Sequence, residues 1–385
     1  MTEKQYGGDT GRVTERTVIN LDKKSAKVIA DKNKSKVNKT TSKVNLSSPV
    51  SSDEEKIIKA GKIASETKKY AASIIKPGVP LLEIAEKIES KIVELGGKPA
   101  FPVNLSIDNI AAHYTPSHDD KTTAHGLLKV DIGVSIDGWA ADTAFSVDLE
   151  NSEENKKLIE ASKKALENAL KLIKDKIEKN IVKVNKDKIG ADSNVNNNYQ
   201  YASSSERILK ESNQQDEQIS TDEMGGMISE VIESFGFSPI INLSGHSMNK
   251  YELHAGITIP NINDKKNIRL KEGLYAIEPF ATTGSGRVHD GKPSGIYELK
   301  ETKNIRSPIA REVLEFIAKE YNTLPFCSRW IIKKLGTKAL FGLKQLEDNG
   351  NIHHYSQLVE VQGSKVSQAE QTILIEKDKI IVTTE

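Results

Sequence analysis

Residues 130–147 of this 385-residue chain read VDIGVSIDGWAADTAFSV, two largely apolar runs joined by Asp137-Gly138. Asp-Gly between two alternating runs is a strong signal for a two-residue hairpin turn. Counting back from that turn pairs Asp142 with Gly133 on the opposite strand. Asp131 lies two residues from Gly133 and therefore points to the same face as Asp142. The sequence thus predicts two carboxylates side by side on one face of a β-hairpin.

Such a pair repels and resists burial, and a bound cation is the simplest remedy. The alternative is a pair of solvent-exposed strand acids. The neighbours of Asp131 and Asp142 are too apolar for that alternative, since they include Ile132, Val134 and Phe145. We therefore interpret the two aspartates as candidate metal ligands.

Two more acids lie in apolar sequence, Glu278 in YAIEPF and Glu370 in QAEQTILI. Together with the aspartates they carry four negative charges, which two divalent cations would neutralise. His246 adds an imidazole, and a set of carboxylates with one imidazole suits Mn, Fe, Co or Zn. Two such ions close together can share a bridging hydroxide, which is the usual basis of metal-dependent hydrolysis.

Two further histidines, His113 and His254, also lie in apolar segments. A single histidine in such a setting is more often a core residue than a functional one. Three of them, in a chain with four acids in apolar strands, favour the functional interpretation.

The rest of the chain indicates an α+β fold. Helical spacing runs from Ser52 towards Ile74, from Leu81 to Leu95 and from Glu153 to about Lys179, while short strands surround His246 and Ile277. Residues 1–52 are polar, have more Lys and Arg than acid, and are expected to form a disordered basic tail. Residues 185–220 are expected to be a low-complexity surface insertion. One catalytic domain is then expected over 53–385.

Composition indicates which classes of partner and which cellular compartment to expect. The 55 Lys and Arg against 54 Asp and Glu give a net charge of +1, which argues against a nucleic acid or an anionic membrane as main partner. Cys327 has no other cysteine to pair with, no apolar run approaches the ~20 residues of a membrane span, and the N-terminus lacks an apolar signal region. A cytoplasmic protein is expected.

The motifs together resemble methionine aminopeptidase. The segments that carry the resemblance are FPVNLS (101–106), AAHYTP (111–116), the Asp131 and Asp142 pair, GHS (245–247), LHAG (253–256), AIEPF (276–280) and QAE (368–370). The helical segment at about 306–350, which contains LPFCSRW (324–330), is similar to the insertion of the type 2 branch. The resemblance covers about 53–385.

The resemblance implies a pita-bread fold with an internal pseudo-two-fold and two divalent metal ions (Co, Mn, Fe or Zn) between its halves. It implies that Asp131 binds one ion, that Asp142 and Glu370 bridge both, and that His246 and Glu278 complete the other. Other roles that it implies are substrate contact for His113 and His254, a methionine pocket formed by Phe101, Leu253 and Tyr355, and proton transfer by Glu278.

The implied activity is removal of the initiator methionine from nascent proteins with a small second residue, by attack of a metal-bound hydroxide on the scissile amide. The basic tail would allow a contact with the ribosome. Two alternatives share the fold: an Xaa-Pro-directed peptidase, and a metal-free protein that binds RNA or the ribosome. One departure from the family is Gln371, which stands where a histidine is more common after the last ligand.

Overall fold

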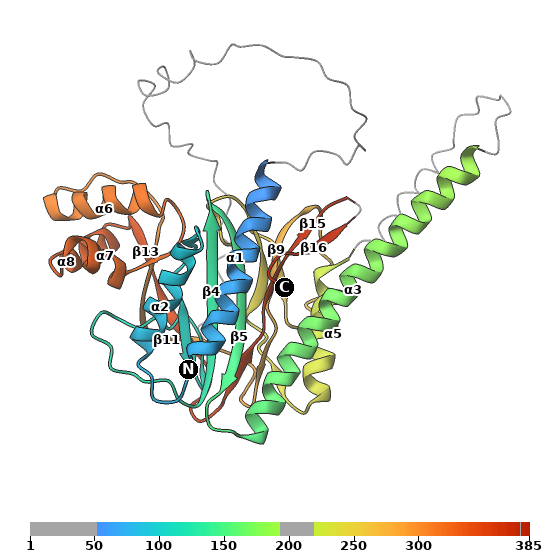
Figure 1. The fold of residues 1–385 in the computed structure, drawn as a ribbon, viewed down its shortest axis with the longest axis horizontal. Coiled ribbons are helices and arrows are strands. Elements are labelled where there is room, and N and C mark those ends of the chain that lie inside the picture. Colours follow the sequence, from blue (N-terminus) through green and yellow to red (C-terminus); the bar gives the residue numbers. More distant parts are fainter. Residues whose placement is uncertain (1–51, 193–218, 378) are drawn as a thin grey trace, which may run out of the picture. The chain divides into compact units, whose positions relative to one another are not determined.

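The computed structural model of this chain describes residues 52–192, 219–377 and 379–385. The expected tail over 1–52 lies outside these residues except for Ser52, and so does most of the expected insertion over 185–220. The described elements form two helix-on-sheet halves and a group of three short helices (Figure 1).

The first half is built around the predicted hairpin. Strands β4 (Leu127–Ile136) and β5 (Trp139–Asp148) pair antiparallel with Gly133 opposite Asp142, as the turn predicts. Asp137 and Gly138 both have positive φ, 50° and 87°, which is the geometry of the favoured hairpin turn. The short strands β1 (Lys98–Pro99) and β2 (Asn104–Ile107) pair with β4.

Helices α1 (Ser52–Ile74) and α2 (Leu81–Glu94) cover this sheet, as Figure 1 shows for α1 over β4 and β5. Their apolar residues recur at helical spacing, and the buried ones pack against the strands. Examples from the resulting core are Ile63, Ile84, Ile88, Val130 and Ile132.

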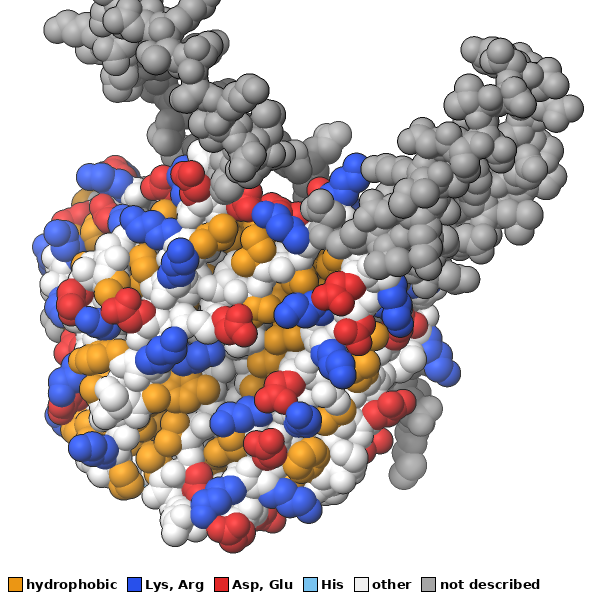
Figure 2. Space-filling model, turned by 45° about the vertical axis from the view of Figure 1, so that its right-hand side comes forward, with side chains coloured by type: hydrophobic (Ala, Val, Ile, Leu, Met, Phe, Trp, Pro, Cys, Tyr) orange, Lys and Arg blue, Asp and Glu red, His pale blue; other side chains and the backbone are white. Residues whose placement is uncertain are grey.

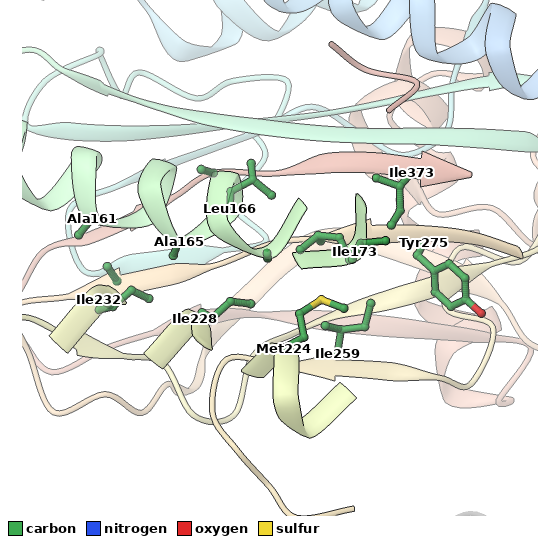
Figure 3. Close-up of a cluster of buried hydrophobic side chains, with 14 of the residues drawn as sticks. Ala161, Ala165, Leu166, Ile173, Met224, Ile228, Ile232, Ile259, Tyr275 and Ile373 are labelled. Atoms are coloured by element: carbon green, nitrogen blue, oxygen red, sulfur yellow. The ribbon is translucent and has the colours of Figure 1, made fainter. Parts of the chain in front are cut away.

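The second half repeats this plan. Helices α3 (Glu153–Asp192) and α5 (Thr221–Ser234) cover a five-stranded sheet in the order β16-β15-β9-β7-β8. Its strands are β7 (Ser244–Met248), β8 (Thr258–Pro260), β9 (Gly273–Ile277), β15 (Gln371–Ile375) and β16 (Ile380–Val382). Figure 3 shows side chains of both helices, such as Ala165 and Ile228, directed towards one another and towards the strands.

Helix α3 extends past its expected end near Lys179. No glycine or proline interrupts residues 153–189, so nothing in the backbone stops the helix there. Within the described part of the chain, its last core side chain is Ile173, with Ile177 partly buried beyond it.

The chain changes sheet at two positions that matter for the site. It leaves β9 and enters β10 (Phe280–Thr282), which pairs with β14 (Val366–Gln368) and β6 (Ser238–Pro239) in a three-stranded sheet. It returns from β14 to β15, beside β9. Glu278 and Glu370 lie at these two changes of sheet, between strands. The sequence had predicted Glu278 inside a strand and Glu370 at the start of one.

The segment between these acids contains the group of short helices, α6 (Pro308–Glu320), α7 (Ser328–Leu335) and α8 (Ala339–Asp348). They pack on a sheet formed by β12 (Phe326–Cys327), β11 (His289–Leu299), β13 (Ile352–Val359) and β3 (Ile110–Ala112). Their own core includes Val313, Ile317, Ile331 and Leu343.

The surface carries both signs of charge. Figure 2 shows Lys and Arg side chains interspersed with Asp and Glu over the face that it presents. Among the helices of the described residues, none is long and apolar enough to span a membrane.

Candidate metal centre

Three side chains from three separate segments meet between the two halves. Asp142 comes from β5, His246 from β7, and Glu370 from the gap between β14 and β15. One ligand atom of each lies within 4.8 Å of the other two. Their exposed fractions are 4%, 5% and 2%, so a cluster of two carboxylates and an imidazole is withdrawn from solvent.

Glu278 and Asp131 complete the cluster. His246 Nε2 lies 3.7 Å from Asp142 Oδ2 and 3.7 Å from Glu278 Oε1. Asp131 lies on β4, on the same face of the hairpin as Asp142. All five candidate ligands named by the sequence are therefore brought together, two from the first half and three from the second.

Burial shifts the ionisation of all four carboxyl groups in the same direction. Burial raises the pKa of Asp131 to about 7. Burial, followed by the charges of neighbouring carboxylates, raises the pKa of Asp142, Glu278 and Glu370 well above the usual range. The same burial lowers the pKa of His246 to about 3, so its ring is neutral and has a lone pair to donate. The cluster thus contains four crowded acids and a neutral imidazole, and none of these five groups supplies a positive charge that would favour ionised carboxylates.

Divalent metal ions fit this site. Asp131 Oδ1, Asp142 Oδ1 and Glu370 Oε2 are buried and have no hydrogen-bond partner. Buried carboxylate oxygens without partners are rare, and an ion or water that binds them is the usual explanation. Oxygen and imidazole donors are the ligands of Mn, Fe, Co and Zn.

Hydrogen bonds between the halves hold the ligand backbones in place. Asp142 N donates to Thr372 Oγ1, and that hydroxyl donates back to Asp142 O, both at 2.8 Å. Glu370 N donates to Ala144 O at 3.0 Å, and Thr143 Oγ1 donates to Glu370 O at 2.9 Å. Each half thus fixes a ligand of the other.

A cavity of about 400 Å³ opens over the cluster. Its lining includes all five candidate ligands and all five other residues that the sequence assigned to substrate. These are His113, His254, Phe101, Leu253 and Tyr355. The cavity therefore combines a metal-binding floor with largely apolar and aromatic walls.

The two histidines on its walls have different neighbours. The ring of His254 stacks edge-on against that of His246, with centroids 4.4 Å apart. The ring of His113 faces Tyr355 at 5.4 Å, and its Nδ1 lies 3.1 Å from Ser356 O. Since a carbonyl oxygen only accepts, Nδ1 of His113 carries the proton and Nε2 is left for another partner. Burial lowers the pKa of His113 to about 4, which keeps the ring neutral near pH 7.

The comparisons with known proteins agree with this site. The model of metallopeptidase family M24 matches residues 55–185. A methionine aminopeptidase of Pyrococcus abyssi is 42% identical over 338 residues, which cover 86% of this chain and 100% of that protein. One of Methanocaldococcus jannaschii is 42% identical over 333 residues, covering 86% of this chain and 98% of that protein.

The chain belongs to the methionine aminopeptidases of metallopeptidase family M24. Membership in this family implies a divalent metal and makes the chain a metal-dependent peptidase. Both predictions from the sequence, family and enzyme class, are confirmed.

Solved structures support the pita-bread fold expected for this methionine aminopeptidase. A methionine aminopeptidase from Thermotoga maritima superposes with a TM-score of 0.54 at 20% identity, covering 89% of this chain and 100% of that one. A thermophilic Arx1 gives a TM-score of 0.65 at 16% identity, covering 86% and 90%. At such identities the likeness concerns the fold alone.

The sequence did not single out Gln368 or Lys68. Gln368 is buried, and its Nε2 donates to Glu278 Oε2 at 3.4 Å. Lys68 of α1 donates to Thr143 Oγ1 at 2.9 Å, directly behind Glu370. Gln368 belongs to the motif QAE, so the sequence contained a signal for it. Nothing in the local sequence of α1 indicated a role for Lys68.

Gln371, the departure from the family, lies on the other side of its strand from Glu370. It lines a surface groove with Lys171 and Lys174 of α3.

Proposed function

We propose that this chain removes the N-terminal methionine from nascent proteins whose second residue is small, using a centre of two divalent metal ions. The observation that carries the proposal is the convergence of ten residues on one cavity, in a chain 42% identical to methionine aminopeptidases over most of its length. Five of the ten are metal-ligand types, four acids and one imidazole gathered in a buried cluster.

In this proposal Asp131, Asp142, His246, Glu278 and Glu370 would together hold the two ions. Two divalent ions match the charge of four carboxylates, and the partnerless oxygens of Asp131, Asp142 and Glu370 support these residues as ligands. When bound, the ions activate water and polarise the scissile carbonyl. Co, Mn, Fe and Zn all suit the donor set.

The chain's own groups handle protons and position the substrate. Glu278, whose side chain lines the cavity, would accept a proton from the attacking water and return it to the leaving amine. His113 presents Nε2 to the scissile amide because Ser356 O holds Nδ1. His254, beside His246, contacts the substrate on the other wall of the cavity.

The cavity walls suit a methionine side chain. Phe101 and Leu253 are 6% and 8% exposed, and Tyr355 completes an apolar and aromatic wall. An unbranched thioether fills such irregular apolar space and makes favourable contacts with aromatic rings. We assign these three residues to the methionine pocket.

Two alternatives predict different products. An Xaa-Pro-directed peptidase would cleave an Xaa-Pro peptide and leave Met-Gly and Met-Ala peptides intact. A metal-free binding protein would cleave none of them. Incubating the purified, metal-loaded protein with Met-Gly, Met-Ala and Xaa-Pro peptides separates the three, and we expect methionine release from the first two alone. Cleavage of only the Xaa-Pro peptide would overturn the proposal.

The proposal also covers the organisation of the chain and its location. Residues 53–385 form the catalytic domain, with 185–220 and about 306–350 as insertions, and the single Cys327 suits the reducing cytoplasm. The basic segment 1–52 tethers weakly to the ribosome through phosphate contacts that depend on salt. A chain that starts at Asp53 should then keep full activity on a short peptide and lose ribosome co-sedimentation at low salt. Lower peptide activity would contradict this.

A further inference from the structure

Arg329 of α7 is buried where the helical segment packs against the first half. It is 3% exposed, and its guanidinium forms a fork with Glu89 of α2, with NH1 and NH2 donating at 2.7 and 2.8 Å. Trp330 Nε1 donates to the same carboxylate at 2.8 Å. This ion pair joins two parts of the chain that are 240 residues apart.

The other side of the guanidinium holds the segment that presents His113. Arg329 Nε donates to Pro116 O at 3.0 Å, and NH2 donates to Thr115 Oγ1 at 3.3 Å. Four residues before Arg329, Pro325 lines the cavity itself. The helical segment therefore reaches both the cavity and the backbone beside His113.

The His113 segment needs such support. His113 has a φ of 63°, a left-handed backbone conformation that residues other than glycine rarely adopt. Such a conformation persists only where the surrounding structure enforces it. His113 follows the last residue of β3, and residues 113–117 belong to no helix or strand. Ser356 O fixes the ring at Nδ1. The backbone of Tyr114 is bonded to β2 on both sides, and Arg329 holds the next two residues, Thr115 and Pro116.

Glu89 extends the same network to the segment that carries Phe101. Its Oε1 accepts from Val103 N at 3.4 Å, between the pocket residues Phe101 and Asn104. A buried ion pair contributes little net stability compared with apolar residues of the same volume, but it fixes geometry through its directed bonds. The contacts of this pair therefore point to positioning.

We propose that Arg329 is a positioning residue for the peptidase reaction, which acts by holding the 113–116 segment so that His113 Nε2 faces the scissile amide. The proposal rests on the proposed function and on the role given there to His113. Glu89 orients Arg329 and does not itself reach the substrate.

A double-mutant cycle tests this coupling. Release of methionine from a Met-Ala peptide is measured for wild type, Arg329→Lys, His113→Ala and the double variant, with Mn²⁺ binding to each chelated protein followed by calorimetry. Lysine keeps the charge but cannot span Glu89 and Pro116 together. We expect Arg329→Lys to lower kcat roughly tenfold or more, as a small misplacement of a reacting group does. Affinity for Mn²⁺ should stay unchanged.

The effect of Arg329→Lys should largely vanish in the His113→Ala background, because the two residues act as one unit. Asn351→Ala is the control for stability. Asn351 is fully buried and donates to Glu301 O and Lys303 O next to the same helices, but does not line the cavity. It should lower the melting temperature and leave kcat in place.

The proposal would be overturned by an equal loss in both backgrounds, by an equal loss of kcat in Asn351→Ala, or by an unchanged kcat in Arg329→Lys. If arginine at this site were needed only for folding, Arg329→Lys would lose Mn²⁺ binding and melting temperature together, which also counts against it. A wild-type protein that releases no methionine would instead refute the proposed function, before any variant is compared.

Discussion

The ring of Phe101 fills the space that a side chain on Gly133 would need. A Cβ built on Gly133 would stand 2.3 Å from Cε1 of Phe101. Gly133 is also the cross-strand partner of Asp142. The aromatic wall of the cavity therefore packs directly on the hairpin that carries both aspartates, and the absence of a side chain at Gly133 permits this.

Gly133→Ala should displace the Phe101 ring and distort the methionine pocket. Overpacking of this kind costs about 1–3 kcal/mol of stability. We expect a higher KM for a Met-Ala peptide, with the affinity for metal changed less. Steady-state kinetics and thermal unfolding check this.

Gly226→Ala is the matched control. Gly226 lies within α5, and its nearest neighbour, Asn263 Cβ, would be 3.5 Å from the new methyl group, an ordinary contact. Replacing a helical glycine with alanine stabilises by up to about 1 kcal/mol. If both variants raised KM equally, contact with Phe101 would not be the cause.

Asp142→Asn should abolish turnover and leave the fold intact. Asp142 lies in the crowded group of carboxylates, so the amide removes repulsion in the metal-free protein while it removes a proposed metal ligand. Loss of metal affinity should exceed the roughly 10–100-fold that changes in outer partners produce. Circular dichroism and methionine release measure the two effects, and full activity in this variant would refute the assignment of Asp142 as a ligand.

Gln368→Ala should weaken metal binding without abolishing activity. Its amide donates to Glu278 Oε2 and orients that carboxylate. We expect metal affinity to fall about 10–100-fold, with activity restored by excess metal. Activity that excess metal does not restore would show that Gln368 acts on substrate instead.

Stability should depend on pH differently with and without metal. Without metal, burial holds the pKa of Asp131 at about 7, above its ordinary 3.8, and the pKa of three neighbouring acids is raised as well. Between these values the folded chain binds more protons than the unfolded chain, so this contribution to stability falls as the pH rises.

Metal ions displace those protons, so metal affinity rises over the same range. The increase in melting temperature produced by Mn²⁺ should therefore grow from about pH 5 to about pH 8. An increase that is larger at the lower pH would contradict the account of the carboxylates.

The hairpin and its two aspartates could be predicted because a two-residue turn fixes the register of both strands. Asp137-Gly138 determined that Asp142 faces Gly133 and shares a face with Asp131, without any distant contact. The α+β class and the pairs of helices followed from periodicity in the same way.

Convergence of the two halves could not be derived locally. Glu278 and Glu370 lie where the chain passes from one sheet to another, next to the three-residue strands β10 and β14. Such short strands leave almost no pattern in the sequence. Their place beside Asp142 came from the resemblance to a family. The bond between Arg329 and Glu89 joins residues 240 positions apart, and its partners are typical surface residues, so no local signal indicated that either is buried.

In the proposed function, the five candidate ligands form a metal centre that supports release of N-terminal methionine. Its most direct test is methionine release from a Met-Ala peptide by the chelator-stripped protein, before and after Mn, Fe, Co or Zn is added singly. The account predicts no release without metal and restored release with at least one of the four ions. Release that persists after complete removal of metal, or no release with any ion from a protein shown to be folded, would contradict it.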